Sequence, residues 1–528
     1  MYGLRGSPSV LVDDSVLPSR DHPYQRHRAS KPSNSAREST RWGLASPENL
    51  ALYLPWNACR SGPVCRSADL GPIRSQGSVY TVLTLFGIMN GVTSTVLPTG
   101  FLEAGLATSV ALTVVVGLLS YHTADLIVRD GGAGYCYRDF SELAGESLGP
   151  WARVAALVSS ITIIMGALVG YHMLMVANIF DEPELAAGCG AALWCSRAVV
   201  SSLLGLPLFL LSSTTRTALL ARLSVVGTIC VVGQLVSAST SAMQAILDPA
   251  EPNIEWSATS LWFGSGRWAP GALSGLLFMS FYIHSFVLQV LNTHARPQRA
   301  TRDLRVSYSL VWLSYVVGGV AGALQQHIYR EAGMPNGGWS QGDWGTFATR
   351  LLTSVHAASF YPMLAVIVRG QLAELIALAD RCSTRAGAAP AAGAGGVVVV
   401  APGSGAGGAN DLTPGRGVFA GWAGQSFAAQ SSGTVVILNL LIIGTSTSMA
   451  AAFSLDVFSA VVRFTGVVGG FIHVLVLPIG VHLKEQRAQQ YDLSKRAFLC
   501  SALFCREAAV FIIGVVCIGL EVLRSFSS

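Results

Sequence analysis

Charged residues are scarce in this chain. Only 12% of the 528 residues are Asp, Glu, Lys or Arg, whereas 51% are hydrophobic. Soluble proteins carry about twice this share of charge, roughly 25%, so the chain has too little polar surface to keep several globular domains in water. The net charge of +5 is scattered, without a basic run interleaved with aromatics, which argues against a nucleic-acid partner. We therefore expect a protein surrounded by membrane lipids.

Signatures of several other function classes are also missing. The chain has no phosphate-binding loop with its lysine, which argues against ATP hydrolysis, no array of arginines typical of a voltage sensor and no TVGYG potassium filter. Its ten cysteines show no zinc-ligand spacing. Four histidines lie in separate apolar segments, and we expect most of them to be structural: His122, His172, His356 and His473. The sequence predicts that the protein is not an enzyme and binds no metal cofactor.

Long apolar runs are what the chain has in abundance. A helix needs about 20 predominantly apolar residues to cross a bilayer. We predict an all-α polytopic membrane domain over residues 78–525, with eleven spans near 78–98, 106–129, 152–180, 197–214, 219–246, 271–292, 305–327, 347–369, 434–453, 457–482 and 506–524. The polar residues 1–77 are predicted to be a disordered cytosolic tail, and residues 381–433, rich in Ala, Gly, Pro and Ser, a flexible cytosolic loop.

Positive charges between the spans predict the orientation. With the N-terminus in the cytosol, sixteen Lys and Arg residues beyond the tail fall on the cytosolic side and four on the opposite side, if four arginines at span starts are set aside. Cytosolic loops of membrane proteins carry this excess of positive charge. We therefore expect a cytosolic N-terminus and, with an odd number of spans, a C-terminus outside the cell or in a lumen.

The first span is poor in helix-forming residues. Gly87, Asn90, Gly91 and Pro98 fall within twelve residues, together with three hydroxyl side chains. A break in a membrane helix frees backbone N–H and C=O groups, which can bind a substrate or an ion when they face a cavity. The alternative is that the glycines only allow close helix packing, although packing explains neither Asn90 nor Pro98.

The sixth span has a polar cluster in its middle. Phe281, Tyr282, His284 and Ser285 lie there, and polar side chains at this depth are costly unless they face a polar cavity. For His284 a structural hydrogen bond and proton carriage are both open. Breaks in spans 1 and 6 would begin two repeats of five helices, the architecture of many secondary transporters. Ser359 in span 8 would either complete an ion site beside span 1 or back-bond to its own helix.

Several stretches resemble a known family. The run from Gly91 to Gly105 resembles the first-helix signature of the amino acid/auxin permease superfamily, and Gly271 to Asn292 is similar to its sixth helix. Further stretches, such as Arg369-Gly-Gln-Leu and Arg463-Phe-Thr-Gly, are similar to the solute-carrier 38 family, in particular its lysosomal, sodium-coupled neutral amino acid transporter 9-like group. The resemblance covers roughly residues 76–525.

The resemblance implies a LeuT-like 5+5 inverted repeat plus an eleventh helix. It also implies secondary active transport of amino acids by alternating access, with the substrate held at broken helices 1 and 6. The residues that it assigns to substrate binding are Met89, Asn90, Gly91, Val92, Thr93, Phe281, Tyr282 and His284. Gly87 and Ser359 fall at the family's ion-binding positions.

One departure concerns the coupling ion. The helix-1 Asn of the family falls on Gly87 here, and Asn90 is displaced by about one turn, so Na⁺ and H⁺ both stay open as coupling ions. A lysosomal or vacuolar membrane is expected from the resemblance. Two rival functions are an amino acid sensor with little transport, signalling to a cytosolic protein partner through the tail, and a proton-coupled amino acid symporter of the plasma membrane.

Overall fold

The computed structural model describes most of the predicted membrane domain. The described residues are 77–131, 137, 139–180, 196–214, 217–247, 259–264, 270–292, 294–331, 344–387, 432–453, 455–489 and 502–527. The predicted tail, up to residue 76, and most of the predicted loop 381–433 lie outside this part. Helix α13 continues to Gly387 and so includes residues 381–387 of the predicted loop, because the helix of span 8 runs on past the predicted end of the apolar stretch. The flexible loop stays a prediction.

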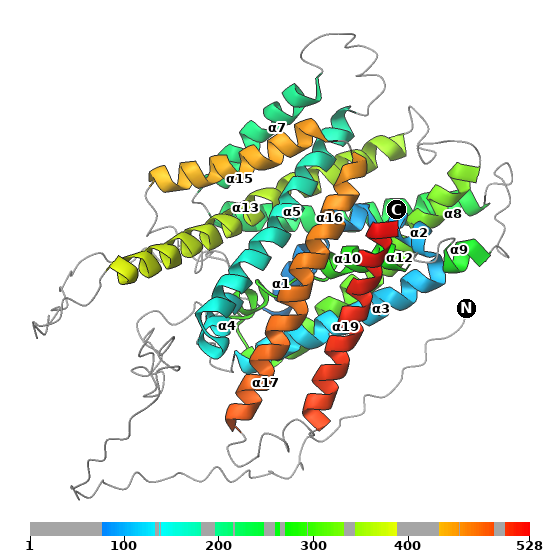
Figure 1. Ribbon diagram of the computed structural model, residues 1–528. Helices are drawn as coiled ribbons and strands as arrows, with labels where there is room; N and C mark the ends of the chain where they lie inside the picture. Colours follow the sequence, from blue (N-terminus) through cyan, green and yellow to red (C-terminus); the bar gives the residue numbers. More distant parts are fainter. Residues whose placement is uncertain are drawn as a thin grey trace, which may run out of the picture. The chain divides into compact units, whose positions relative to one another are not determined.

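The described part of the chain is helical, and long helices cover most of the predicted spans (Figure 1). In the first half these are α3 (Leu106–Asp130), α5 (Pro150–Phe180), α7 (Arg197–Ser212) and α8 (Thr217–Leu247), with α4 (Phe140–Leu148) before α5. In the second half they are α12 (Ala300–Glu331), α13 (Trp344–Gly387), α15 (Ser432–Ala452), α16 (Leu455–Gly470), α17 (Leu477–Gln489) and α19 (Ala502–Ser527). Seven of the described helices are long and apolar enough to cross a membrane.

Two predicted spans consist of short pieces instead. Span 1 is divided into α1 (Ser78–Met89), the 3₁₀ turn η3 (Val92–Thr95) and α2 (Leu97–Ala104). Span 6 is divided into α10 (Gly271–Ser280) and α11 (Val287–Asn292). Two further short elements flank span 6: α9 (Thr259–Phe263) and η5 (Pro297–Arg299). The pieces of both spans pack among the long helices, α1 and α2 against α12 and α10 against α16 and α19.

Glycines set the close approach of α10 and α16. A Cβ on Gly275 would lie 2.7 Å from the backbone oxygen of Arg463, and one on Gly466 would lie 2.0 Å from the oxygen of Gly275. Real Cβ atoms do not come this near, so the two helices touch backbone to backbone. Small residues at helix interfaces commonly serve this purpose in membranes, and here they hold the first half of span 6 in place.

A π-helical segment, η6 (Phe471–Val476), joins α16 to α17. Such widened turns occur mostly as single turns within α-helices and often at functional sites. Here the segment contains the buried His473. Beyond it, the His482 ring of α17 lies 3.1 Å from the carboxylate of Asp130 at the end of α3. The segment therefore determines which face α17 presents to α3.

The two charged residues at the start of the last span, Arg506 and Glu507, pair with each other, and Glu507 also contacts His122. The Glu507 side chain of α19 is fully buried, and its carboxylate lies 3.0 Å from His122 Nε2 and 2.6 Å from an Arg506 guanidinium nitrogen. A buried carboxylate without such partners would be costly. Elsewhere large apolar side chains stay exposed, for example Leu203, Leu206 and Leu210 on α7, as expected of a surface that faces lipid acyl chains.

Candidate functional site

Helix α1 ends where Asn90 leaves the helical conformation. Both the backbone N–H and the side-chain amide of Asn90 donate to Phe86 O, at 2.9 and 3.1 Å, and the Asn90 Oδ1 atom accepts from Ser314 of α12 at 2.8 Å. These bonds cap the end of α1 and hold it against span 7. The chain then turns at Gly91, whose N–H donates to Met89 O at 2.7 Å, and enters η3. Asn90 therefore shapes the break rather than lying beyond it.

Helix α10 ends at Ser280, and residues 281–286 are not helical. The freed oxygen of Phe281 accepts from the Ser120 hydroxyl of α3 at 2.8 Å and lies 3.3 Å from the Tyr308 hydroxyl of α12. The Phe281 ring stacks on Tyr308. A Cβ at Gly117 would lie 3.1 Å from that ring, so the glycine of α3 makes room for it. Residues of α3 and α12 thus satisfy the backbone at this break.

Tyr315 of α12 joins the two breaks. Its hydroxyl contacts the oxygen of Met89, at the end of α1, and lies 2.9 Å from the oxygen of Ser280, at the end of α10. A phenol has one proton to donate, whereas each carbonyl only accepts. The Tyr315 hydroxyl therefore cannot donate to both oxygens at once, and the pair of carbonyls forms a buried, electron-rich position.

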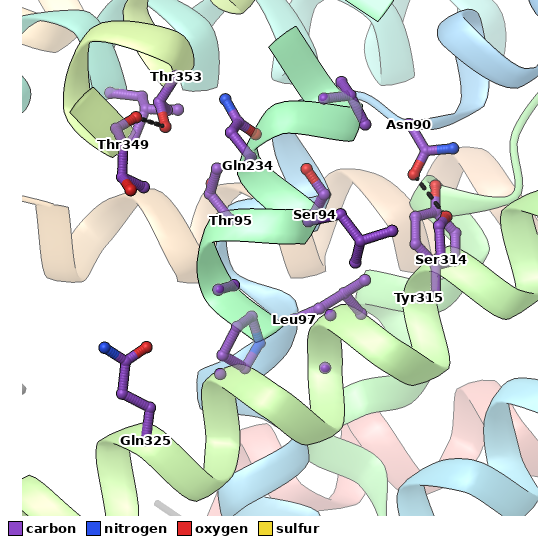
Figure 2. Close-up of a pocket in the computed structure, with 18 of the residues that line it drawn as sticks. Asn90, Ser94, Thr95, Leu97, Gln234, Ser314, Tyr315, Gln325, Thr349 and Thr353 are labelled. Atoms are coloured by element: carbon purple, nitrogen blue, oxygen red, sulfur yellow. Dashed lines mark hydrogen bonds between the residues drawn. The ribbon is translucent and has the colours of Figure 1, made fainter. Parts of the chain in front are cut away.

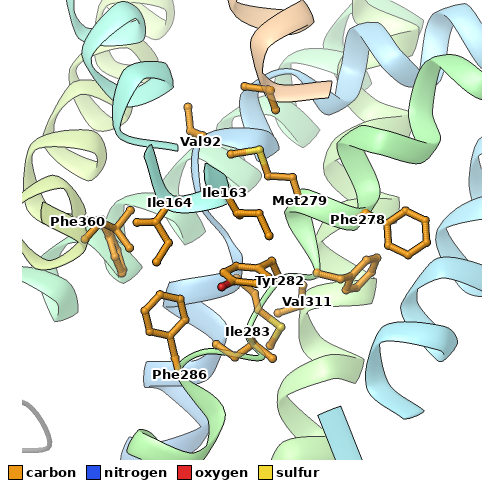
Figure 3. Packing of buried hydrophobic residues seen from close by; sticks show 14 of the residues in the cluster. Val92, Ile163, Ile164, Phe278, Met279, Tyr282, Ile283, Phe286, Val311 and Phe360 are labelled. Atoms are coloured by element: carbon orange, nitrogen blue, oxygen red, sulfur yellow. The ribbon is translucent and has the colours of Figure 1, made fainter. Parts of the chain in front are cut away.

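A small cavity of about 40 Å³ lies beside this position, between η3, α5 and α10. That is room for two or three water molecules at most. Figure 3 shows Val92, Ile163, Ile164, Met279 and Tyr282 around it. The remaining lining residues are Ile88, Gly91, Thr93, Ala167, Tyr171, Phe286 and Leu364. An amino acid enters only if the segments that line the cavity move apart.

Two polar side chains, those of Thr93 and Tyr171, line this cavity. The Thr93 hydroxyl is buried and faces the Tyr315 hydroxyl, without a hydrogen bond of regular geometry to any described residue. The Tyr171 hydroxyl of α5 lies 3.3 Å from His356 Nε2 of α13. A Cβ at Gly91 would lie 3.1 Å from that hydroxyl. Glycine therefore brings the backbone of the break against the Tyr171 hydroxyl.

A larger vestibule of about 350 Å³ begins at the other face of the same break (Figure 2). Figure 2 shows Asn90, Ser94, Ser314 and Tyr315 at one side of it, with Gln234 and Thr353 facing them. The polar lining continues with Thr95, Asn178, Gln325, Gln326, Thr349 and Arg350. In the orientation that the loop charges predict, the vestibule opens away from the cytosol. It connects that side with the break in span 1.

A buried hydrogen-bonded network lies on the opposite side of the cavity. The Tyr282 hydroxyl donates to Ser160 of α5 at 2.8 Å and contacts the Ser285 hydroxyl, which lies 2.9 Å from His473 Nε2. Gln371 of α13 donates to Ser160 at 2.8 Å. The network ties the break in span 6 to the long helices α5 and α13 and to the π-helical segment η6, and closes this side.

The two residues proposed to bind an ion, Gly87 and Ser359, lie close together. Each is already in contact with other groups of the protein. The Ser359 hydroxyl donates to Val355 O of its own helix at 2.6 Å. A Cβ at Gly87 would lie 2.4 Å from Thr228 Oγ1 of α8 and 3.0 Å from the ring of Phe360. Side chains of α8 and α13 thus pack directly on Gly87. Ion binding by Gly87 and Ser359 stays a prediction.

The structure thus brings most of the predicted substrate residues around two neighbouring breaks. His284 lies apart from the cavity lining, with its Nε2 atom 2.9 Å from the Thr123 hydroxyl of α3. Sequence reasoning did not assign Tyr171, Tyr315 or His356 to the site, and it expected His356 to be structural. Each lies near other polar residues, for example His172 beside Tyr171 and Ser314 beside Tyr315, and no spacing relates one of the three to another. Substrate binding by the predicted residues stays a prediction.

Comparisons with known proteins find similarity to amino acid transporters. The family model described as transmembrane amino acid transporter protein matches residues 74–324. The neutral amino acid transporter 9 of Xenopus tropicalis is 21% identical over 416 residues, which are 68% of this chain and 73% of that protein. The sodium-coupled neutral amino acid transporter 9 homolog of Caenorhabditis elegans is 19% identical over 477 residues, 78% of this chain and 69% of that protein.

A solved structure shares the fold. A Na⁺-coupled sialic acid symporter in a substrate-bound, outward-open state superimposes with a TM-score of 0.51 and 12% identity, over 85% of this chain and 90% of that chain. The predicted LeuT-like helical fold and the predicted family resemblance are confirmed. All of these matched proteins are transporters, so the chain resembles transporters and not enzymes.

Proposed function

We propose that this chain, a multi-pass membrane protein similar to the transmembrane amino acid transporters, carries neutral amino acids across a membrane by alternating access, with the substrate held between its two breaks. One observation carries the proposal: the Tyr315 hydroxyl lies between Met89 O and Ser280 O, one carbonyl from each break. A group with several N–H donors satisfies two carbonyls better than a single O–H does. An α-ammonium group has three such donors and a positive charge, and would replace the Tyr315 hydroxyl.

The carboxylate of the substrate would lie at the other side of the small cavity. The Tyr171 hydroxyl and the backbone N–H of Val92 face each other there, and Gly91 leaves the approach open. Hydrogen bonds to a carboxylate are among the stronger ones in proteins. With the ammonium group at Met89 O and the carboxylate at Tyr171, the α-carbon of the substrate would lie between these two residues. The side chain of the substrate would then extend toward Tyr282, Met279 and the apolar lining.

The two sides of the site differ in a way that suits alternating access. The vestibule reaches the break in span 1 from one face, whereas the network around Tyr282 and Ser285 closes the other. Release toward the closed side requires Tyr282 to part from Ser160, which lies on α5, outside the broken spans, and is itself bonded to Gln371 of α13. Rocking of the broken spans against α5 and α13 would open that network and close the vestibule.

The names of the relatives, neutral amino acid transporter 9, favour substrates without net charge.

The target membrane and the coupling ion belong to the same proposal. The resemblance to the lysosomal group favours a lysosomal or vacuolar membrane over the plasma membrane, which localisation of a tagged full-length chain would test. Either Na⁺ beside Gly87 and Ser359 or H⁺ would supply the driving force. A cytosolic partner of the tail would be found by crosslinking in intact cells.

Reconstitution tests the function directly. The full-length chain in liposomes is loaded with unlabelled amino acid, and counterflow of labelled L-alanine, L-leucine and L-arginine is measured. We expect saturable counterflow of the two neutral amino acids and much less of L-arginine. Saturable binding of L-leucine without counterflow would instead support a sensor, and neither binding nor counterflow would refute the proposed function.

A further inference from the structure

The His356 ring of α13 is held between a backbone carbonyl and a hydroxyl of the cavity. Its Nδ1 atom lies 3.1 Å from Gly227 O of α8, and its Nε2 atom 3.3 Å from the Tyr171 hydroxyl. The rings of His356 and Tyr171 meet edge to face, and both side chains are almost completely inaccessible to solvent. The Tyr171 hydroxyl in turn faces Val92 and the space beside Gly91. One oxygen atom therefore connects the imidazole with the proposed carboxylate position.

The hydrogen-bond directions follow from these partners. A carbonyl only accepts, so the Nδ1 atom of His356 carries a proton and donates to Gly227 O. In the neutral ring the Nε2 atom is then the acceptor, and Tyr171 must donate to it. Because a phenol has one proton, the Tyr171 oxygen presents only lone pairs to the cavity in this form. A carboxylate placed beside it would be repelled.

Protonation of the ring reverses this pattern. An Nε2–H group donates to the Tyr171 oxygen, which frees the hydroxyl proton of Tyr171 to point into the cavity. The proton reaches Nε2 through the phenol: Tyr171 gives its proton to the ring while its oxygen takes one from a hydronium ion in the cavity. The hydronium ion becomes a water molecule, the O–H bond of Tyr171 is remade, and the balance is one proton added to His356.

We propose that His356 binds the proton that is coupled to transport, and that it does so together with the substrate carboxylate, through Tyr171. This inference rests on the proposed function, since it assigns the coupling ion of the same site. Proton and carboxylate would favour each other's binding, because only the charged ring lets Tyr171 donate to the substrate. By linkage the effect is reciprocal.

The charged groups around His356 leave the substrate carboxylate as the partner of a protonated ring. The charged side chains of the described part of α13 and of the long helices packed against it are Arg153, Arg197, Arg222, Arg350, Arg369, Glu374 and Asp380. Of the two carboxylates, Glu374 pairs with Arg153 at 2.5 Å, and Asp380 lies still farther along α13 from His356 than Glu374 does. Among the titratable neighbours His172, Cys230 and Tyr361, His172 has its Nε2 atom 3.1 Å from Ser201 O. A protonated His356 would therefore find its anion in the cavity.

Other buried histidines are less suited to this role. The Nδ1 atoms of His172 and His284 have no hydrogen-bond partner among the residues that the structure describes, so an added proton there would be left without an acceptor. His473 is bonded at both nitrogens to serine hydroxyls, Ser159 and Ser285. It touches the cavity only through the further step of Tyr282. His356 is one hydroxyl away from the break in span 1.

The experiment measures amino acid affinity against pH on the purified full-length chain. Binding of labelled L-leucine is recorded between pH 5 and pH 7.5, a range in which the net charge of the free amino acid is constant. For the wild type we expect the affinity to rise as the pH falls, by up to about tenfold per pH unit. His356→Gln, which keeps hydrogen-bonding groups but cannot be protonated, should bind with an affinity that does not depend on pH.

Two further variants separate the explanations. Tyr171→Phe keeps the histidine but removes the link, and should lose the pH dependence as well. His172→Gln, a matched change of a neighbouring buried histidine that faces Ser201, should keep the wild-type slope. In liposomes, an inward pH gradient should accelerate L-leucine uptake by the wild type and by His172→Gln, and should have no effect on His356→Gln.

The outcomes distinguish the inference from the proposed function. Counterflow by the wild type together with a pH-independent affinity would overturn the assignment of His356 and leave the proposed function standing. A normal pH slope in His356→Gln or in Tyr171→Phe would overturn it too, so the test does not depend on one variant folding. Absence of both binding and counterflow in the wild type would refute the proposed function, and the inference with it.

Discussion

The hydroxyl of Tyr315 offers the sharpest test of where the substrate lies. Tyr315→Phe removes one oxygen atom and leaves the ring, which packs edge to face on Phe281. The Met89 oxygen keeps the N–H of Gly91 as a donor, whereas the Ser280 oxygen loses the hydroxyl that lies 2.9 Å from it. A buried carbonyl that loses its donor costs about 1–3 kcal/mol. The variant without substrate should be destabilised by this amount.

Substrate binding should remove that penalty. If the ammonium group takes the place of the hydroxyl, it restores a donor to Ser280 O in the variant, and it no longer has to displace Tyr315. A gain of about 1–2 kcal/mol corresponds to roughly five- to thirtyfold tighter binding. We therefore expect Tyr315→Phe to bind L-leucine more tightly than the wild type, although it unfolds at a lower temperature when no amino acid is present.

Equilibrium binding and thermal unfolding, each with and without saturating L-leucine, check this expectation. Tyr308→Phe is the matched control, since the Tyr308 hydroxyl also lies 3.3 Å from a carbonyl of the span 6 break, that of Phe281, but does not touch Met89. It should lose stability while its affinity stays within about twofold of the wild type. Unchanged or weaker binding by Tyr315→Phe would show that the ammonium group does not lie between the two carbonyls.

Three further expectations follow from the break, the ion position and the loop charges. Gly91→Val should abolish uptake while the protein still reaches its membrane, because a Cβ would already lie 3.1 Å from the Tyr171 hydroxyl; normal uptake with surface labelling intact would contradict this. Ser359→Ala should raise the Na⁺ concentration for half-maximal uptake several-fold and leave amino acid selectivity alone; an unchanged Na⁺ dependence argues against an ion at this hydroxyl. Protease protection should find the N-terminus in the cytosol and the C-terminus on the other side, and both termini on one side would rule out eleven spans.

Sequence reasoning located the irregular segments of the membrane helices better than it located the side chains that contact them. Gly87, Asn90, Gly91 and Pro98 in one apolar run indicated where the first span would be irregular, because such residues are costly within a helix. Local chemistry was enough for this, since helix propensity and capping act over a few residues. The same reasoning placed span ends to within several residues, and it missed the extension of α13 to Gly387 because a polar helix end carries no apolar signal.

The partners of the breaks could not be predicted in the same way. Tyr315 lies 226 residues from Met89, and His356 lies 185 residues from Tyr171. A tyrosine or histidine in an apolar run is most often a satisfied core residue, and nothing local distinguishes one that contacts a break. Only the packing of α12 and α13 against the broken spans brings these side chains to the cavity. The family resemblance supplied the fold but not these contacts.

The π-helical segment Phe471–Val476 has a consequence for the length of the chain at this point. A π turn holds one residue more than an α turn, and each residue of an α-helix advances the direction of its side chain by about 100°. Removing one residue from the segment would let the helix close into regular α geometry and would turn all of α17 by this angle. His482 would then swing away from Asp130, to which its ring lies at 3.1 Å. Length, and not only composition, is therefore fixed in this stretch: a substitution that keeps the apolar character would be tolerated far better than a deletion of a single residue.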